Sequence, residues 1–571
     1  MKFAFKPIAI AAALAFIGTA AVASPMKPGT YTAKVNGHNA PLTVEVTVDA
    51  NKILSIKTPD DQESLGVGKV GLKKTADNIL RYQSIGVDAV TGATFSSNAL
   101  KEGVEKCLKQ AGADMKQFTR KAEKHPIHNR TYQADVVVIG GGGAGLASAI
   151  SSMQAGAKKV IVLEKLGYVG GSTNVSEGAL NAVDDQRQKA QGIKDSYETF
   201  YETTMHGGHD KGDPTLVRFL TSHSMDAVNW LESLGVKFND HIGAATGSLG
   251  QRSHYPATPY GNTYIRTFEK VIADSNGKIQ VLLDTPAVKL IQNKSGRVVG
   301  VVGNNFGSKV TVMAKDGVII ATGGFGANVA YRQKVNTGVW KNIKLDNSIG
   351  CTNIQKAAQG QGLFLAQKVG AKLIGLSDIQ IHPCGTPGTG LMENIRTSGR
   401  NRIFVNSDGN RFVNEGAARD VLANAIFQQK GRTYWIVVNK LRYPTPDFKD
   451  RMGASIRNME ALGAVVEAPT LDELAKKTGM NAENLKKAIA DYNAVVSGKA
   501  KDKLGFVANN KDDKQMTEGP WYACRKVPTV HHTMGGIKIN VKSQVINTKG
   551  KVIPGLYAVG EVTGGIHGSN R

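Results

Sequence analysis

The hydrophobic pattern of the first part of the chain predicts a small domain that mixes strands and helices. Polar and apolar side chains alternate over residues 43–48, as they do in a half-buried strand. Residues 72–83 and 98–108 instead carry apolar side chains at helical spacing. We therefore expect an α+β domain at 26–112.

A second pattern begins after a polar, Lys-rich segment at 113–130, which we interpret as a linker. Residues 134–139 are typical of a buried strand, residues 146–154 of a helix, and residues 160–163 of a second buried strand. Strand, helix and strand in this order predict a βαβ unit with a parallel sheet. The fold class expected for the whole chain is therefore α/β.

Residues 1–23 have the pattern of a secretory signal rather than of a structural element. Two lysines precede an apolar run at 8–17, and an Ala-Val-Ala sequence stands directly before Ser24. We expect cleavage near Ala23/Ser24 and a periplasmic protein; an N-terminal membrane anchor is the alternative. No later apolar run of about 18 residues follows, so stable membrane insertion is not expected.

Composition narrows the function classes. The chain has 71 Lys+Arg against 47 Asp+Glu, a net charge of +24, but these residues are scattered and no DNA-binding motif accompanies them. We expect no nucleic-acid partner; a positive surface suits an anionic substrate or an acidic electron-transfer partner. The four cysteines form no C-x-x-C pair, so neither a zinc ribbon, nor C-x-x-C-H haem attachment, nor another metal site is predicted: Cys107, Cys351, Cys384 and Cys524.

A glycine-rich segment follows the strand at 134–139 and predicts a dinucleotide site. Gly140, Gly142 and Gly145 form G-x-G-x-x-G before a helix, and Glu164 stands 19 residues beyond the last glycine. Glycines let the backbone approach a pyrophosphate, the helix N-terminus supplies N–H donors, and the carboxylate can accept from ribose hydroxyls. A structural glycine-rich turn is the alternative interpretation.

Three later loops of small residues favour FAD over NAD as the nucleotide. They lie at 170–173, at 319–324 and at 555–561, where a strand runs into Gly-Glu. The predicted FAD-binding residues are Gly140, Gly142, Gly143, Ala144, Gly145, Glu164, Lys165, Gly171, Ser172, Thr173, Gly323, Gly324 and Glu561.

The segments 321–324 (ATGG), 555–561 (GLYAVGE) and 564–571 (GGIHGSNR) resemble the fumarate reductase/succinate dehydrogenase flavoprotein superfamily, in particular its fumarate and urocanate reductases. The resemblance implies a Rossmann-like domain that binds FAD non-covalently, formed by 131–376 and 531–571, with an inserted α+β clamp domain at 377–530. The family continues with a helix beyond this point, so we expect the FAD domain to be truncated at residue 571.

The same resemblance implies a set of catalytic residues for reduction of a C=C bond beside a carboxylate. Arg419, in the segment 411–420, matches the arginine that donates the proton, and Glu393 and Arg396 match its E-x-x-R relay. The other matches are with substrate-binding or flavin-adjacent residues: His382, His531 and Arg571 for the substrate, and His532 near the flavin. The alternatives are that Arg419 is a surface arginine, that Glu393 and Arg396 are a solvated pair in a loop, and that the histidines are structural.

The identity of the substrate stays open at this stage. Met392 replaces the threonine expected in fumarate reductases, and Ile381 and Asn394 replace the tyrosine and acid expected in urocanate reductases. A fumarate-, urocanate- or cinnamate-like acid is therefore the expected substrate class.

Residues 88–97 (DAVTGATFSS) resemble the motif of exported FMN-binding domains, in which FMN is joined through its phosphate to a threonine. The match implies a phosphoester at Thr94, with Ser96 and Ser97 as fallback sites. An ordinary turn before a helix is the alternative.

These matches together imply a two-flavin reductase of anaerobic respiration. Electrons would come from an external donor, such as a membrane-anchored quinol-linked cytochrome, and pass through FMN and FAD to the unsaturated acid. An electron carrier without a substrate of its own and a ketosteroid-type dehydrogenase are the rival functions.

Overall fold

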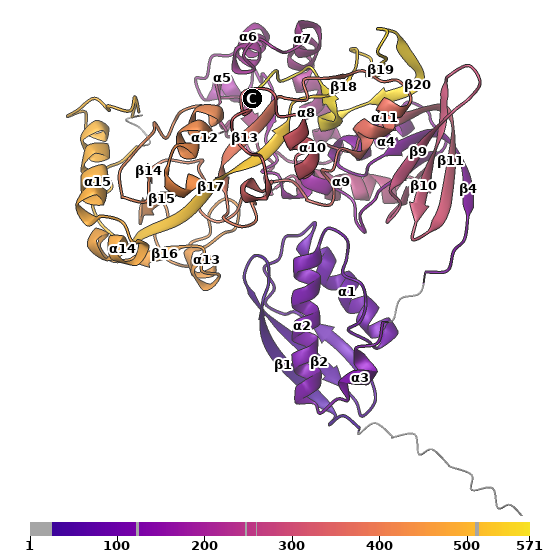
Figure 1. Ribbon diagram of the computed structural model, residues 1–571, viewed down its shortest axis with the longest axis horizontal. Helices are drawn as coiled ribbons and strands as arrows, with labels where there is room; N and C mark the ends of the chain where they lie inside the picture. Colours follow the sequence, from indigo (N-terminus) through magenta and orange to yellow (C-terminus); the bar gives the residue numbers. More distant parts are fainter. Residues whose placement is uncertain (1–24, 122–124, 246–247, 259, 509–512, 571) are drawn as a thin grey trace, which may run out of the picture.

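The computed structural model describes residues 25–121, 125–245, 248–258, 260–508 and 513–570. The predicted signal at 1–23 and the predicted clamp residue Arg571 therefore lie outside the described residues. Figure 1 shows the small domain, in indigo and violet, as a body distinct from the larger remainder of the chain.

The small domain is a three-stranded antiparallel meander covered by helices. Its strands are β1 (Gly29–Asn36), β2 (Pro41–Val48) and β3 (Ile53–Lys57), and its helices are α1 (Gly68–Tyr82), α2 (Thr94–Gln110) and α3 (Met115–Phe118). Every second residue of β2 is buried, as the alternation at 43–48 predicts. Phe118 is 1% exposed and packs in the same core, so this domain extends beyond the predicted end at Gly112.

The centre of the larger part is a mainly parallel sheet in the order β19-β20-β11-β4-β5-β8. Its strands are β4 (Arg130–Ile139), β5 (Val160–Leu163), β8 (Ile279–Leu282), β9 (Ala287–Gln292), β10 (Val298–Asn305), β11 (Ser308–Ile320), β19 (Gln544–Ile546) and β20 (Val552–Ala558). β11 runs parallel to β4 on one side and to β20 on the other, and β4 runs parallel to β5. The carboxyl ends of β4, β11 and β20 therefore meet at one edge of the sheet.

Helices and short strands surround this sheet. They are α4 (Gly143–Gln154), η1 (Gly171–Val175), β6 (Leu180–Asn181), α5 (Arg187–Ala190), α6 (Tyr197–Gly207), α7 (Pro214–Ser222), α8 (Ser224–Ser233), β7 (Ser253–His254), α9 (Asn262–Ala273), α10 (Val329–Lys334), η2 (Asn347–Ile349) and α11 (Gln361–Lys368). Within the residues that the structure describes, no helix is long and apolar enough to cross a bilayer.

A second, antiparallel sheet has the order β13-β17-β15-β14, with β16 paired to β17. Its elements are β13 (Ile379–Gly385), β14 (Arg402–Val405), α12 (Arg419–Phe427), η3 (Lys430–Arg432), β15 (Tyr434–Asn439), α13 (Ile456–Ala461), β16 (Val466–Ala468), α14 (Leu471–Thr478), α15 (Ala482–Val496) and β17 (Trp521–Thr533). A small sheet completes the fold and consists of β12 (Leu373–Ile374), β18 (Gly536–Lys538) and β21 (Thr563–Gly564). The short helix η4 (Gly560–Val562) lies between β20 and β21 along the chain. β17 runs without a break across the predicted boundary between residues 530 and 531, and so connects the clamp to the FAD domain (Figure 1).

Candidate active site

A cleft with an open volume of about 930 Å³ lies at the carboxyl ends of β4, β11 and β20. Twelve of the predicted FAD-binding residues line it: Gly140, Gly142, Gly143, Ala144, Glu164, Lys165, Gly171, Ser172, Thr173, Gly323, Gly324 and Glu561. Gly145 lies behind this wall, where a side chain would overlap with the carbonyl oxygen of Gly140. The cleft follows from the strand–glycine–helix pattern, because ligands of such sheets bind outside the carboxyl ends of the strands.

The walls of the cleft suit an extended dinucleotide. Helix α4 begins at Gly143 without a side-chain cap, so its N-terminus offers main-chain N–H donors and a positive dipole end. Thr322 also lines the cleft, and its buried hydroxyl has no hydrogen-bond partner among the described residues. The residues present thus fit FAD, whose pyrophosphate needs donors and a close backbone approach.

Glu164 and Lys165 set the charge at one end of this cleft. Burial raises the pKa of Glu164, although its carboxylate accepts hydrogen bonds from the N–H groups of Leu166 (2.7 Å) and Gly141 (2.6 Å). Burial likewise lowers the pKa of Lys165 to about 8, against the opposing effect of Glu164. The charge of Lys165 therefore changes with pH around 8.

Two predicted substrate-binding histidines come together beside the cleft. The rings of His382, on β13, and His531, on β17, have centroids 4.9 Å apart. Nδ1 of His531 lies 2.7 Å from the hydroxyl of Thr352, and the next residue, Asn353, lines the cleft. Nδ1 of His382 accepts a hydrogen bond from the N–H of Cys384 at 3.1 Å. The paired strands thus hold both imidazoles next to the expected flavin position.

Arg419 is joined to the same region through Gln380. The Arg419 guanidinium donates to Oε1 of Gln380 at 3.0 Å, and Nε2 of Gln380 donates to Oδ1 of Asn570 at 2.9 Å. Gln380 lies on β13 two residues before His382, so β13 positions both His382 and the partner of Arg419. Nδ1 of His532 lies 3.2 Å from the sulfur of Met534.

The two predicted relay residues have different partners. Nε2 of His38, in the small domain, is 3.0 Å from Oε1 of Glu393, whereas Arg396 pairs with Glu177 at 3.2 Å. Glu177 also pairs with Arg451 at 2.7 Å. Burial opposes the charge of Arg396, but Glu177, Tyr260 and other neighbouring groups together outweigh burial and raise the pKa of Arg396.

Sequence reasoning missed Glu177, Arg451 and Gln380, because no motif marked them. The guanidinium of Arg451 lies 4.1 Å from the ring centre of Tyr255, and the positive charge of Arg419 acts on Tyr255 as well. Burial raises the pKa of Tyr255, and Glu177 adds to this effect.

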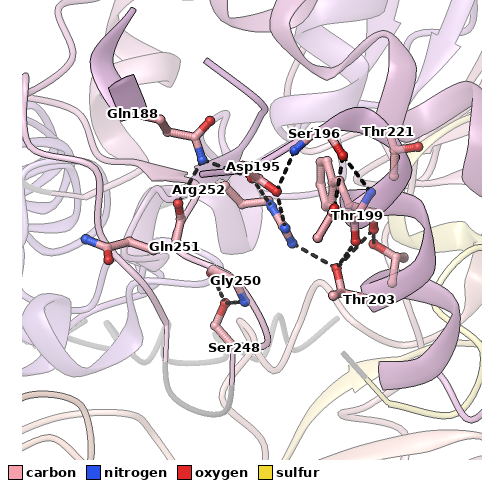
Figure 2. Close-up of polar contacts among 12 residues, drawn as sticks. Gln188, Asp195, Ser196, Thr199, Thr203, Thr221, Ser248, Gly250, Gln251 and Arg252 are labelled. Atoms are coloured by element: carbon pink, nitrogen blue, oxygen red, sulfur yellow. Dashed lines mark hydrogen bonds and ion pairs between the residues drawn. The ribbon is translucent and has the colours of Figure 1, made fainter. Parts of the chain in front are cut away.

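A buried ion pair supports the segment that leads to Tyr255 (Figure 2). Arg252 binds Asp195 with two hydrogen bonds, of 2.8 and 2.7 Å, and both side chains are about 5% exposed or less. Gln188 donates to the same carboxylate at 2.9 Å, and Arg252 donates to the Thr203 hydroxyl at 3.0 Å. This bidentate geometry fixes the chain three residues before Tyr255.

Thr94 is the first residue of α2, and its side chain is exposed. The neighbouring Ala93 packs in a cluster with Tyr168 and Ala357, and Ala357 lines the FAD cleft. The fallback hydroxyls are buried and engaged, since Ser96 donates to Glu63 at 2.6 Å and Ser97 accepts from the N–H of Val90 at 3.2 Å. Helix α2 also begins without a side-chain cap, so the Thr94 site fits a group joined through a phosphate.

Comparison with known proteins gives two family matches. The FAD binding domain family matches residues 135–571, and the FMN-binding domain family matches residues 37–109.

Relatives span most of the chain. It is 34% identical to an NADH:acrylate oxidoreductase of Vibrio harveyi, over 95% of this chain and 59% of the relative, so it spans about three fifths of that protein. It is also 34% identical to a urocanate reductase of Eggerthella lenta, over 95% of this chain and 88% of the relative. The structure of an open flavocytochrome c3 fumarate reductase matches with a TM-score of 0.63 and 33% identity, covering 77% of this chain and 74% of that one. The chain belongs to the family of FAD-dependent fumarate and urocanate reductases, and it carries an FMN-binding domain.

Proposed function

We propose that this protein is an FAD-dependent oxidoreductase that reduces the C=C bond of an α,β-unsaturated carboxylate. The observation that carries the proposal is that His531 pairs with His382 and reaches Thr352, next to the cleft-lining Asn353, while Arg419 is bound to Gln380 on the strand of His382. These groups offer positive charge and N–H donors, which a carboxylate substrate needs and which an electron carrier without a substrate does not. The relatives named for acrylate, urocanate and fumarate all act on such acids.

The residues of the chain divide the work in this proposal. The cleft around Gly142, Glu164 and Glu561 would hold FAD, which when bound would supply the hydride for the β-carbon, and the small domain would hold FMN as the source of electrons. His382 and His531 bind the substrate carboxylate and stabilise the negative charge that develops on it. Arg419 gives a guanidinium proton to the α-carbon and regains one through neighbouring groups. Arg571 would bind the same carboxylate, at the position directly after Asn570.

Packing supports electron delivery through the small domain. The cluster that holds Ala93 reaches Ala357 in the wall of the FAD cleft, and Tyr168 donates to the carbonyl of Gly92 at 3.1 Å. A flavin on Thr94 would therefore lie beside the FAD cleft. We further propose covalent attachment at Thr94, export to the periplasm, and a membrane-anchored quinol-linked cytochrome as the electron donor.

Oxidation of reduced viologen with fumarate, urocanate, cinnamate and acrylate tests this function in the full chain loaded with both flavins. At least one acid should be reduced, and Arg419→Ala should lower kcat by about a thousandfold, within the range for loss of a general acid. Asp420→Asn is the matched control, because Asp420 follows Arg419 on α12 and pairs with His209 instead. Turnover with none of the acids favours the electron-carrier alternative, and near-normal turnover by Arg419→Ala refutes the assignment of the acid.

A further inference from the structure

One contact between the small domain and the catalytic part of the chain has no role in the reaction proposed above. His38 lies in the turn between β1 and β2, and its Nε2 is 3.0 Å from Oε1 of Glu393. The two side chains are 28% and 30% exposed, so water reaches both. The contact therefore joins the domain that carries Thr94 to the loop that carries the predicted relay.

The loop holds Glu393 in this outward orientation. Lys526 is fully buried on β17, and its ammonium donates to the carbonyl oxygen of Glu393. Asn394 follows with φ +60°, a left-handed conformation that asparagine tolerates better than most residues. Beyond this turn Arg396 points to Glu177 instead. The carboxylate of Glu393 is thus directed to His38 by contacts within its own domain.

The His38 turn is fixed from the other side by one buried carboxylate. Oε1 of Glu63 accepts from the N–H of His38 at 2.6 Å and of Asn39 at 3.2 Å, and its Oε2 accepts from the hydroxyl of Ser96 at 2.6 Å. Ser96 lies two residues after Thr94, and the Phe95 ring packs edge-on against His38 at 5.6 Å. The turn is therefore attached to the first turn of the helix that begins at Thr94.

The imidazole of His38 has one nitrogen available for proton exchange. Nδ1 lies 3.0 Å from Oδ1 of Asn39, an acceptor, so Nδ1 keeps its hydrogen. Nε2 is then the nitrogen that faces the Glu393 carboxylate. The charged groups around this contact are Glu393 itself, Glu63 on the His38 backbone, and Lys526 behind Glu393.

We propose that His38 takes up protons from solvent and passes them to Glu393, so that the proton for each reduction enters through the small domain. The N–H bond at Nε2 breaks and an O–H bond forms at Oε1, and the electron pair of the N–H bond stays on Nε2, which binds the next solvent proton. The O–H bond then breaks as Glu393 passes its proton through the predicted relay to Arg419 and becomes a carboxylate again. The inference rests on the proposed function, because it supplies the proton that Arg419 uses. Separation of the small domain would then interrupt the supply of protons and of electrons together.

Three variants of the flavin-loaded full chain test this route. His38→Gln keeps a polar side chain but carries no exchangeable ring proton, and His38→Ala leaves space for added imidazole. Gln62→Ala is the matched control, because Gln62 accepts from Asn458 at 2.6 Å, a second contact between the same domains that leaves Glu393 untouched.

For an acid that the wild type reduces, His38→Gln should lower kcat about tenfold with little change in KM. It should also raise the solvent isotope effect on kcat and change the pH profile of kcat. Added imidazole should restore the kcat of His38→Ala, whereas the loss of a merely structural side chain would not be rescued in this way. In the flavin-free protein, hydrogen exchange over residues 391–397 should rise in His38→Gln and not in Gln62→Ala.

A wild-type pH profile and kcat in His38→Gln, or no response of His38→Ala to imidazole, overturns the proton route alone. A wild-type protein that reduces none of the acids overturns the proposed function, and this inference with it.

Discussion

The pairing of Glu177 with Arg396 gives a quantitative prediction for Glu177→Gln. The substitution removes two ion pairs, at 3.2 Å to Arg396 and 2.7 Å to Arg451. The Arg451 side chain is 47% exposed, so that pair contributes little. Arg396 is only 11% exposed and Glu177 18%, and a hydrogen bond to a charged group in such a setting is worth about 2 kcal/mol.

If Arg396 must be held in place to return protons to Arg419, this loss falls on the chemical step. About 2 kcal/mol corresponds to roughly a 30-fold decrease in kcat, with KM nearly unchanged. The assay is viologen oxidation with the best acid of the panel, and Arg451→Gln serves as the control that leaves Arg396 and Glu177 paired. A Glu177→Gln enzyme within twofold of wild type, or an equal loss in Arg451→Gln, would refute the reasoning.

Three further predictions concern the flavins and the scaffold. Lys165 has a pKa of about 8 and is cationic below it, so the affinity for FAD should fall as the pH rises from about 7 to 9. In fluorescence titrations, the FAD affinity of Lys165→Gln should not change over this range. A wild-type affinity that is independent of pH contradicts this prediction. Asp195→Asn leaves Arg252 buried without its counter-charge and should cost about 3–5 kcal/mol in urea unfolding, against about 1 kcal/mol for Thr203→Ala; equal costs would contradict the buried-pair argument. Thr94→Val should abolish the flavin mass on the peptide that contains it while Thr94→Ser keeps it, and flavin retained in Thr94→Val would point to another residue.

Local sequence patterns predicted those elements whose conformation is decided by residues close in the sequence. The alternation at 43–48 became β2, and Gly140, Gly142 and Gly143 line the cleft, because turns and helix starts are decided within a few residues. The small-residue segments at 170–173 and 319–324 likewise predicted the other loops of the cleft. The predicted α/β fold class is confirmed by the mainly parallel central sheet.

Side-chain partners across long sequence separations could not be read from the chain. The E-x-x-R spacing predicts that Glu393 and Arg396 act together, yet their side chains bind His38 and Glu177, which come from two other parts of the molecule. Glu177 follows a cleft-lining loop and has no motif of its own. The relay roles of Glu393 and Arg396 stay predictions; the His38 variants test Glu393 through its partner, and Glu177→Gln tests Arg396 in the same way.

The position of β20 in the central sheet has a consequence for assembly. Gly140 and Glu561 both line the flavin cleft although some four hundred residues separate them. Contacts between such distant segments form late in folding, since the loop between them must first be closed. The nascent chain can thus complete its small domain and first βαβ unit early, but it can retain FAD only after β20 has paired with β11. Once bound, the cofactor stabilises that final pairing by mass action, so cellular flavin supply would govern how much of the protein matures.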